Sequence, residues 1–219
     1  MATTKVIDIL DRATIILQDN SNVRFPNEEL LKFFNDAQKE VVLHRPDANM
    51  VNTTMDLADG SKQTLPAAAL RLVEVIRNEG GRAVTLVERR ILDETLPNWH
   101  NAVAGTNKIE HYVYDPADPK NFYVYPKGVS DTHTLEIVYS SAPAEISISA
   151  FDTDATTISL DDIYSNCLLD YVLYRAYQKD SEYAGNAQRS MMHYQSFANA
   201  LGVKTQADMA TTPVPTTGA

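Results

Sequence analysis

The sequence predicts an α+β protein in which a helical bundle, built from the N- and C-terminal segments, carries an inserted antiparallel β-rich domain. Near both ends of the chain, apolar residues recur with a period close to 3.6, the period of an amphipathic helix. In the middle, apolar and polar residues alternate in short segments separated by turn residues, which is typical of strands. We therefore expect residues 1–48 and 158–203 to form the bundle, residues 49–157 the insertion, and residues 204–219 an extended C-terminal tail.

Two amphipathic helices are expected at the N-terminal end. Apolar residues from Val6 to Leu17 fall on one face of a helix. A second helix is expected to begin at Pro26, which is followed by two acidic residues, a combination favoured in a first turn. This helix should end near His44, because Pro46 disfavours helical geometry at the residue before it.

The middle of the chain is predicted to contain mostly strands. A short helix is expected over residues 89–96, where Pro97 ends it. An aromatic cluster in the later strands has two interpretations, cross-strand packing or a binding surface. Its members are Tyr112, Tyr114, Phe122, Tyr123 and Tyr125. The expected strands cover residues 51–57, 70–77, 82–87, 109–114, 122–125 and 134–140.

A helical hairpin is predicted over residues 159–202, and the rest of the bundle is organised around it. Ser159, Asp161 and Asp162 are expected to cap its first helix. That helix is apolar nearly all round, so it needs neighbours on several sides. The second helix repeats apolar residues three and four positions apart, which indicates a seam facing one partner. We expect identical copies to cover part of this hairpin. The candidate interface residues are Tyr164, Leu168, Tyr171, Tyr174, Tyr177, Met191 and Tyr194.

Composition narrows the possible function. The chain has 219 residues and a formal net charge of −10, which argues against sequence-specific DNA binding because such proteins usually present a basic face. No apolar run is long enough to cross a membrane, and we expect neither a signal peptide nor membrane binding. The single cysteine, Cys167, lies in the apolar helix and is interpreted as a reduced core thiol.

No pattern in the sequence indicates catalysis. The five histidines lack the spacing of a metal site, and there is no phosphate-binding loop, dinucleotide fingerprint or nucleophile elbow. We therefore expect no catalytic residue, no cofactor and no bound metal. The alternative from the enzyme class is a hydrolase that uses His111 and Asp115.

Three stretches resemble the head-to-tail adaptors, or connectors, of tailed phages: residues 24–48, 111–126 and 160–209. The resemblance implies a non-enzymatic ring, usually of twelve copies, that joins the portal protein to the tail and continues the DNA channel. The implied partners are further copies of the chain, the portal protein and a tail-tube or nozzle protein, while double-stranded DNA only passes through. The implied location is the head–tail junction of the virion, after assembly in the host cytoplasm. The alternative is a tail-tube or nozzle component of the virion.

Overall fold

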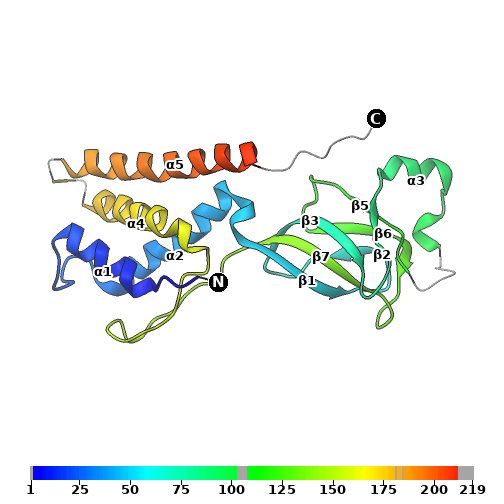
Figure 1. The fold of residues 1–219 in the computed structure, drawn as a ribbon, viewed down its shortest axis with the longest axis horizontal. Helices are drawn as coiled ribbons and strands as arrows, with labels where there is room; N and C mark the ends of the chain where they lie inside the picture. Colours follow the sequence, from blue (N-terminus) through cyan, green and yellow to red (C-terminus); the bar gives the residue numbers. More distant parts are fainter. Residues whose placement is uncertain (1, 103–107, 181, 184, 212–219) are drawn as a thin grey trace. The chain divides into compact units, whose positions relative to one another are not determined.

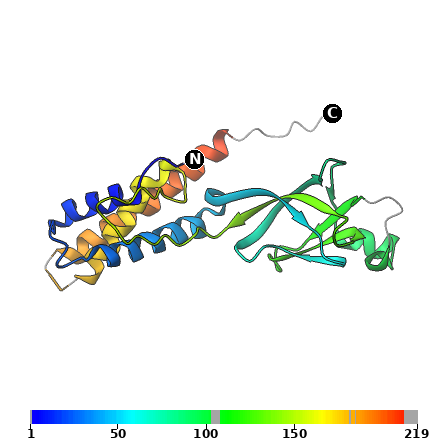
Figure 2. The ribbon, with the colours of Figure 1, turned by 90° about the horizontal axis from the view of Figure 1, so that it is seen from below.

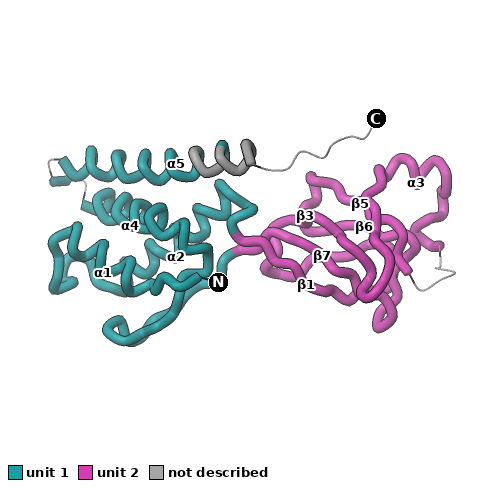
Figure 3. The backbone as a smooth tube through the Cα atoms, viewed as in Figure 1, with its two compact units in different colours: residues 1–48, 143–219 teal, residues 49–142 magenta. Residues whose placement is uncertain are grey.

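The computed structural model describes residues 2–102, 108–180, 182–183 and 185–211, and the side chains of residues 203–205 and 207–211 are not described. The chain divides into two compact units (Figure 3). Unit 1 comprises Met1–Ala48 and Pro143–Ala219, and unit 2 comprises Asn49–Ala142. Helices from both ends of the sequence flank a β-rich middle, so the predicted α+β class is confirmed (Figure 1).

The described residues of unit 1 form four α-helices, of which α4 is the central one (Figure 1). It packs against α1 and α2 on one side and against α5 on the other, and Figure 2 shows the same helices from below. A short 3₁₀ turn, η3 (Asp162–Tyr164), leads directly into α4. The helices are α1 (Val6–Leu17), α2 (Asn27–His44), α4 (Ser165–Lys179) and α5 (Asn186–Thr211).

The helices form because their apolar side chains meet in one core. Fully buried side chains come from every helix, and each contributes roughly 1.5–3 kcal/mol by leaving water. The apolar residues that recur with a period of 3.6 in the sequence therefore lie on the helix faces that point into this core. The fully buried members include Ile9 and Leu10 of α1, Leu30 and Phe34 of α2, Leu168 and Leu173 of α4, and Phe197 of α5.

The segment 143–157 lies in unit 1, whereas the sequence analysis assigned it to the insertion. Two of its apolar side chains, Ile146 and Ile148, are buried in the core of unit 1. The main chain at Ile146 is also bonded to Asn35 of α2. These long-range contacts have no local signal, so the Pro-, Ser- and Thr-rich composition of the segment did not reveal them.

The expected capping of the hairpin also differs. Asp162 does not cap the helix that follows it, since neither η3 nor α4 has a side-chain cap. Its carboxylate instead accepts hydrogen bonds from the main-chain N–H groups of Thr3 and Thr4, at 2.9 and 2.8 Å, and from the Thr3 hydroxyl at 2.7 Å. The N-terminal segment is thereby attached to the start of the hairpin.

The C-terminal helix extends farther than expected. The backbone of α5 is helical as far as Thr211, so residues 204–211, which the sequence analysis assigned to an extended tail, continue the helix. Residues 212–219 of that expected tail lie outside the described residues.

The strands described in unit 2 form two sheets. The three-stranded sheet has the order β1-β7-β3, and the four-stranded sheet has the order β2-β6-β5-β4. All pairings are antiparallel except that of β4 with β5, which is parallel and spans only two residue pairs. The strands are β1 (Met50–Asp56), β2 (Gly60–Thr64), β3 (Ala69–Asn78), β4 (Thr85–Leu86), β5 (His111–Tyr114), β6 (Asn121–Gly128) and β7 (Thr134–Ser141). The 3₁₀ turn η1 (Pro46–Asn49) precedes β1.

Residues from both sheets form the main core of unit 2. Leu72, Leu135 and Ile137 of the three-stranded sheet cluster with Phe122 and Val124 of the other sheet. A smaller cluster forms where α3 (Arg89–Thr95) and η2 (Trp99–Asn101) meet the four-stranded sheet.

Trp99 anchors that smaller cluster. It is 1% exposed, and its indole Nε1 donates to Asp93 Oδ1 at 2.8 Å.

Candidate functional site

Four of the seven candidate interface residues belong to the core of a single chain. They are not available on its surface because α1, α2 and α5 surround α4 and already cover it. The sequence showed correctly that α4 needs neighbours on several sides, but it did not show that the same chain provides them. The four, with their exposed fractions, are Tyr164 (3%), Leu168 (0%), Tyr171 (8%) and Tyr177 (8%).

The other three candidates lie at or near the surface of the α4–α5 hairpin. Met191 is 54% exposed, and Tyr174 and Tyr194 are half-buried. The rings of Tyr174 and Tyr194 contact each other with their centroids 5.0 Å apart. Tyr171 joins the group through Phe197, at 5.2 Å. An interface role for Met191, Tyr174 and Tyr194 stays a prediction.

The inner side of α5 is fixed by polar as well as aromatic contacts. The Ser190 hydroxyl donates to the main-chain oxygen of Tyr174 at 3.1 Å. His193 Nδ1 lies 2.9 Å from Asp170 Oδ1, and the His193 ring stacks on Tyr177. These contacts set the rotation of α5, and they decide which of its residues face outward.

The outer side of α5 is exposed, and it carries no charge over a long stretch. No Asp, Glu, Lys or Arg occurs between Arg189 and Lys204, although 22% of the whole chain is charged. Met191 and Met192 are 54% and 59% exposed. Among the side chains of this stretch that the structure describes, the remaining exposed ones are uncharged and mostly small: Gln195, Ser196, Ala198, Asn199, Ala200 and Gly202. We call this surface the outer face of α5. Its composition is more typical of a contact surface than of a solvated helix face.

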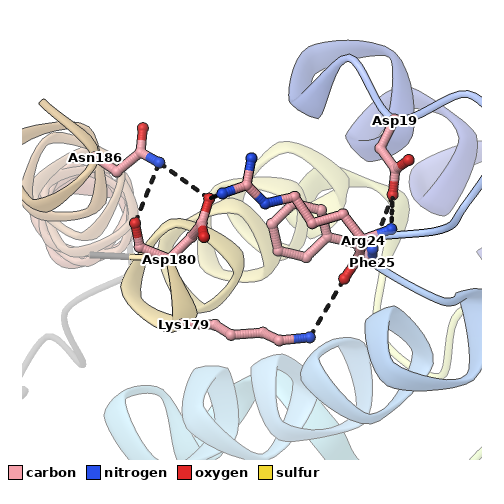
Figure 4. Close-up of polar contacts among 6 residues, drawn as sticks. All are labelled: Asp19, Arg24, Phe25, Lys179, Asp180 and Asn186. Carbon is pink, nitrogen blue, oxygen red and sulfur yellow. Dashed lines mark hydrogen bonds and ion pairs between the residues drawn. The ribbon is translucent and has the colours of Figure 1, made fainter. Parts of the chain in front are cut away.

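A polar network fixes one end of the hairpin (Figure 4). Arg24, which lies just before α2, forms an ion pair with Asp180 at the end of α4. Asn186 Nδ2, at the start of α5, donates to both the main-chain and a side-chain oxygen of Asp180, at 3.3 and 3.2 Å. Lys179 Nζ donates to the main-chain oxygen of Arg24 at 3.3 Å and pairs with Glu29 at 2.5 Å.

Asp19 fixes the shape of the connection between α1 and α2. Its carboxylate accepts hydrogen bonds from the main-chain N–H groups of Val23, Arg24 and Phe25, at 2.8–3.2 Å. These bonds, the one from Phe25 foremost, hold the pKa of the Asp19 carboxyl below its ordinary value. Sequence reasoning missed the network at this end of the hairpin because its members are polar residues from helix ends and loops that lie far apart in the sequence.

His111 and Asp115, the two residues of the alternative hydrolase site, each have a different partner. His111 Nδ1 lies 2.6 Å from the Thr85 hydroxyl, and Asp115 Oδ1 accepts a hydrogen bond from the N–H of Ala117 in its own turn. No hydrogen bond joins His111 to Asp115 among the described residues. Throughout the described residues, no group of three His, Cys, Asp or Glu side chains is placed to hold a metal ion. No helix formed by those residues is both long and apolar enough to cross a membrane.

A family model described as SU10 adaptor protein matches residues 4–217, which include the helices of unit 1 and all of unit 2. The chain belongs to the SU10 adaptor protein family. Membership agrees with the resemblance to phage head-to-tail adaptors, and an SU10 adaptor is a structural protein of the phage. No curated protein matched the sequence.

Proposed function

We propose that this SU10 adaptor is a non-enzymatic subunit of a homo-oligomeric ring, of about twelve copies, that joins the phage portal to the tail and continues the DNA channel. The observation that carries the proposal is the match of one adaptor family to nearly the whole chain, residues 4–217. The ring, the portal contact and the channel are properties of the head-to-tail adaptors that the chain resembles.

The outer face of α5 supports the ring. A ring contact is heterologous, so each copy must offer two different surfaces that fit each other. Met191 and Met192 provide flexible apolar side chains that adapt to a partner surface. The absence of Asp, Glu, Lys and Arg between Arg189 and Lys204 removes the cost of desolvating charged groups on association. We place one of the two ring surfaces on the outer face of α5.

The acidic balance of the chain is compatible with a channel for DNA. A formal charge of −10 disfavours tight binding to phosphates, which a passage for moving DNA must avoid. In this proposal double-stranded DNA passes through the ring, and no residue reads its sequence.

The location of the protein in the virion tests this function. Purified protein mixed with portal rings should form particles of defined rotational symmetry in electron microscopy. Density for the protein directly beneath the portal is expected. Density farther down the tail would instead support a tail-tube or nozzle component, and failure to associate with any portal or tail protein would contradict the adaptor role.

The role of the outer face of α5 is tested separately. Met191→Lys combined with Met192→Lys should leave the chain folded, because both side chains are more than half exposed, but should abolish ring formation. Leu43→Lys is the matched control, since Leu43 is a 72% exposed apolar residue of α2. Sedimentation should show rings for the control only. Rings of normal size from the double variant would place the interface elsewhere without contradicting the adaptor role.

A further inference from the structure

We propose that a groove on unit 2, beside the outer edge of β5, binds an extended segment of another virion protein that carries a lysine or arginine next to an apolar side chain. The identity of the partner as a virion protein rests on the proposed adaptor function. The groove has a volume of about 380 Å³. Its lining comes from the strand ends around β4, from β5 and β6, and from the turn between β5 and β6. We call it the β5 groove, and it is lined chiefly by Leu86, Val87, Val113, Tyr114, Pro116 and Tyr123, with Glu88, Asp115 and Asp118 among its polar members.

The apolar lining of the groove ranges from buried Val113 to highly exposed Leu86. Leu86 is 61% exposed, whereas Val84, two positions earlier, is buried. Residues two positions apart in a strand lie on the same face, so this face changes from buried to exposed within two residues. Tyr123 is half-buried and packs against the cluster around Trp99. Of the aromatic cluster noted in the sequence, Tyr112 and Phe122 are core residues, so only the others are available at a surface.

The edge of β5 is unpaired where it borders the groove. Strand β4 pairs with β5 only through Thr85 and Leu86, and the last hydrogen bond of this ladder runs from Val87 N to Tyr112 O at 2.9 Å. Because strand residues alternate in direction, the main chain of Tyr114 turns toward the same side as that of Tyr112. No described residue accepts a hydrogen bond from the Tyr114 N–H on that side.

This geometry favours strand addition. An extended segment that lies along β5 beyond the end of β4 would continue the ladder with main-chain hydrogen bonds. The side chains of the incoming segment would alternate between the apolar groove and its rim. The edge of β5 beside Tyr114 is open because β4 ends at Leu86 and the chain continues into α3 at Arg89.

The charge around the groove selects the partner. Glu88, Asp115 and Asp118 are exposed. Asp115 and Asp118 each use one carboxylate oxygen within the turn, at 2.9 Å to Ala117 N and 2.8 Å to Asn121 Nδ2.

Arg89, which also lines the groove, is already paired. Its Nε lies 3.4 Å from Asp93. The charge that remains around the groove is therefore negative, and it complements a lysine or arginine of the bound segment.

A peptide probe tests the proposal on the full-length protein, independently of ring assembly. The probe is acetyl-Thr-Val-Lys-Val-Thr-amide, and the same peptide with Glu in place of Lys is its control. The lysine peptide should shift the amide signal of Tyr114 in ¹⁵N NMR spectra, whereas the glutamate peptide should not. Asp115→Asn with Asp118→Asn keeps the oxygen acceptors of the turn, removes two charges and should weaken binding about fivefold. Asp131→Asn, in the turn after the other end of β6, is the control and should bind as the unchanged protein does.

Three results would overturn the proposal: no shift at millimolar peptide, equal binding of both peptides, or unchanged binding by the double variant. A second measurement uses the natural partner. Virions assembled with Asp115→Lys and Asp118→Lys protein should lose attachment of the partner while the purified protein still forms rings. Loss of rings in this variant would assign the surface to subunit contact and contradict the inference, whereas absence of rings in the unchanged protein would contradict only the proposed function.

Discussion

Asn35 and the main chain of Ile146 exchange two hydrogen bonds. Asn35 Nδ2 donates to Ile146 O at 2.9 Å, and Ile146 N donates to Asn35 Oδ1 at 3.0 Å. The Asn35 side chain is buried in α2 and therefore holds the segment 143–157 against the helices as a neighbouring strand would. One amide side chain thus attaches the returning chain to unit 1.

Replacing Asn35 by Ala should destabilise unit 1. Both main-chain groups of Ile146 would lose their partners inside the protein, and we expect the free energy of unfolding to fall by about 2–4 kcal/mol. Urea titration followed by circular dichroism measures this change. Asn199→Ala is the control, because Asn199 is exposed on α5, and it should change the free energy by less than about 0.5 kcal/mol when measured on monomers. Equal losses in the two variants would contradict the structural role of Asn35.

Asp162 should make the protein sensitive to acid. Hydrogen bonds from Thr4 and Thr3 hold the pKa of its carboxyl well below the ordinary value of 3.8. The stabilisation from this carboxylate is complete above the pKa of the unfolded chain, and it is lost as the pH falls below that value toward the lower pKa of the folded chain.

The variant Asp162→Asn should therefore be less stable than the unchanged protein at pH 7, and its stability should fall less steeply below pH 4. Melting temperatures across this pH range measure both effects. Asp161→Asn is the control, because it removes the same charge one residue earlier, where the described residues make no side-chain hydrogen bond. Its melting temperature should change with pH as that of the unchanged protein does. If both variants followed the same curve, the contact with Thr3 and Thr4 would not be the cause.

Phe197 should contribute strongly to the packing of α5 against the rest of unit 1. It is fully buried and contacts the rings of Tyr171, Tyr194 and His44. Phe197→Ala should cost about 3–5 kcal/mol, as is usual for a buried aromatic residue. Met192→Ala, on the exposed side of the same helix, should cost less than about 0.5 kcal/mol when measured on monomers. A large loss for Met192 would show that α5 is rotated from the described position.

The thiol of Cys167 should be inert in the folded protein. Burial, and to a lesser extent the nearby charge of Asp170, raises the pKa of this thiol, so little reactive thiolate exists at neutral pH. Iodoacetamide should label less than a tenth of the native chains in an hour (about an order of magnitude slower than a free thiol) but label the denatured chain completely. Rapid labelling of the native chain would contradict the burial of Cys167.

The helices of unit 1 could be predicted from sequence because their apolar residues recur at helical spacing. Val6, Ile9 and Leu10, for example, define the inner face of α1 without reference to any other segment. Strand β2 was missed because Gly60–Thr64 contains no large apolar residue and is held mainly by main-chain pairing with β6. The bonds of Asn35 and Asp162 were missed because their partners lie 111 and up to 159 residues away.

The exposure of the candidate interface residues could be predicted only in part, and their interface role stays a prediction. The apolar character of α4 correctly indicated burial, but periodicity does not distinguish cover by the same chain from cover by a neighbouring copy. Met191 was identified from its position in the helical seam, whereas its exposure depends on how Phe197 and Ser190 orient α5. The β5 groove could not be foreseen, since it depends on where β4 stops pairing with β5.

The first and last strands of unit 2 are neighbours in one sheet: Met50 of β1 pairs with Ser140 of β7, and Asn49 Nδ2 donates to Ser141 O at 2.9 Å. The polypeptide therefore leaves unit 2 beside the point where it came in. Because its two ends are adjacent, a change in the length of unit 2 does not alter the spacing of the points at which the chain enters and leaves it.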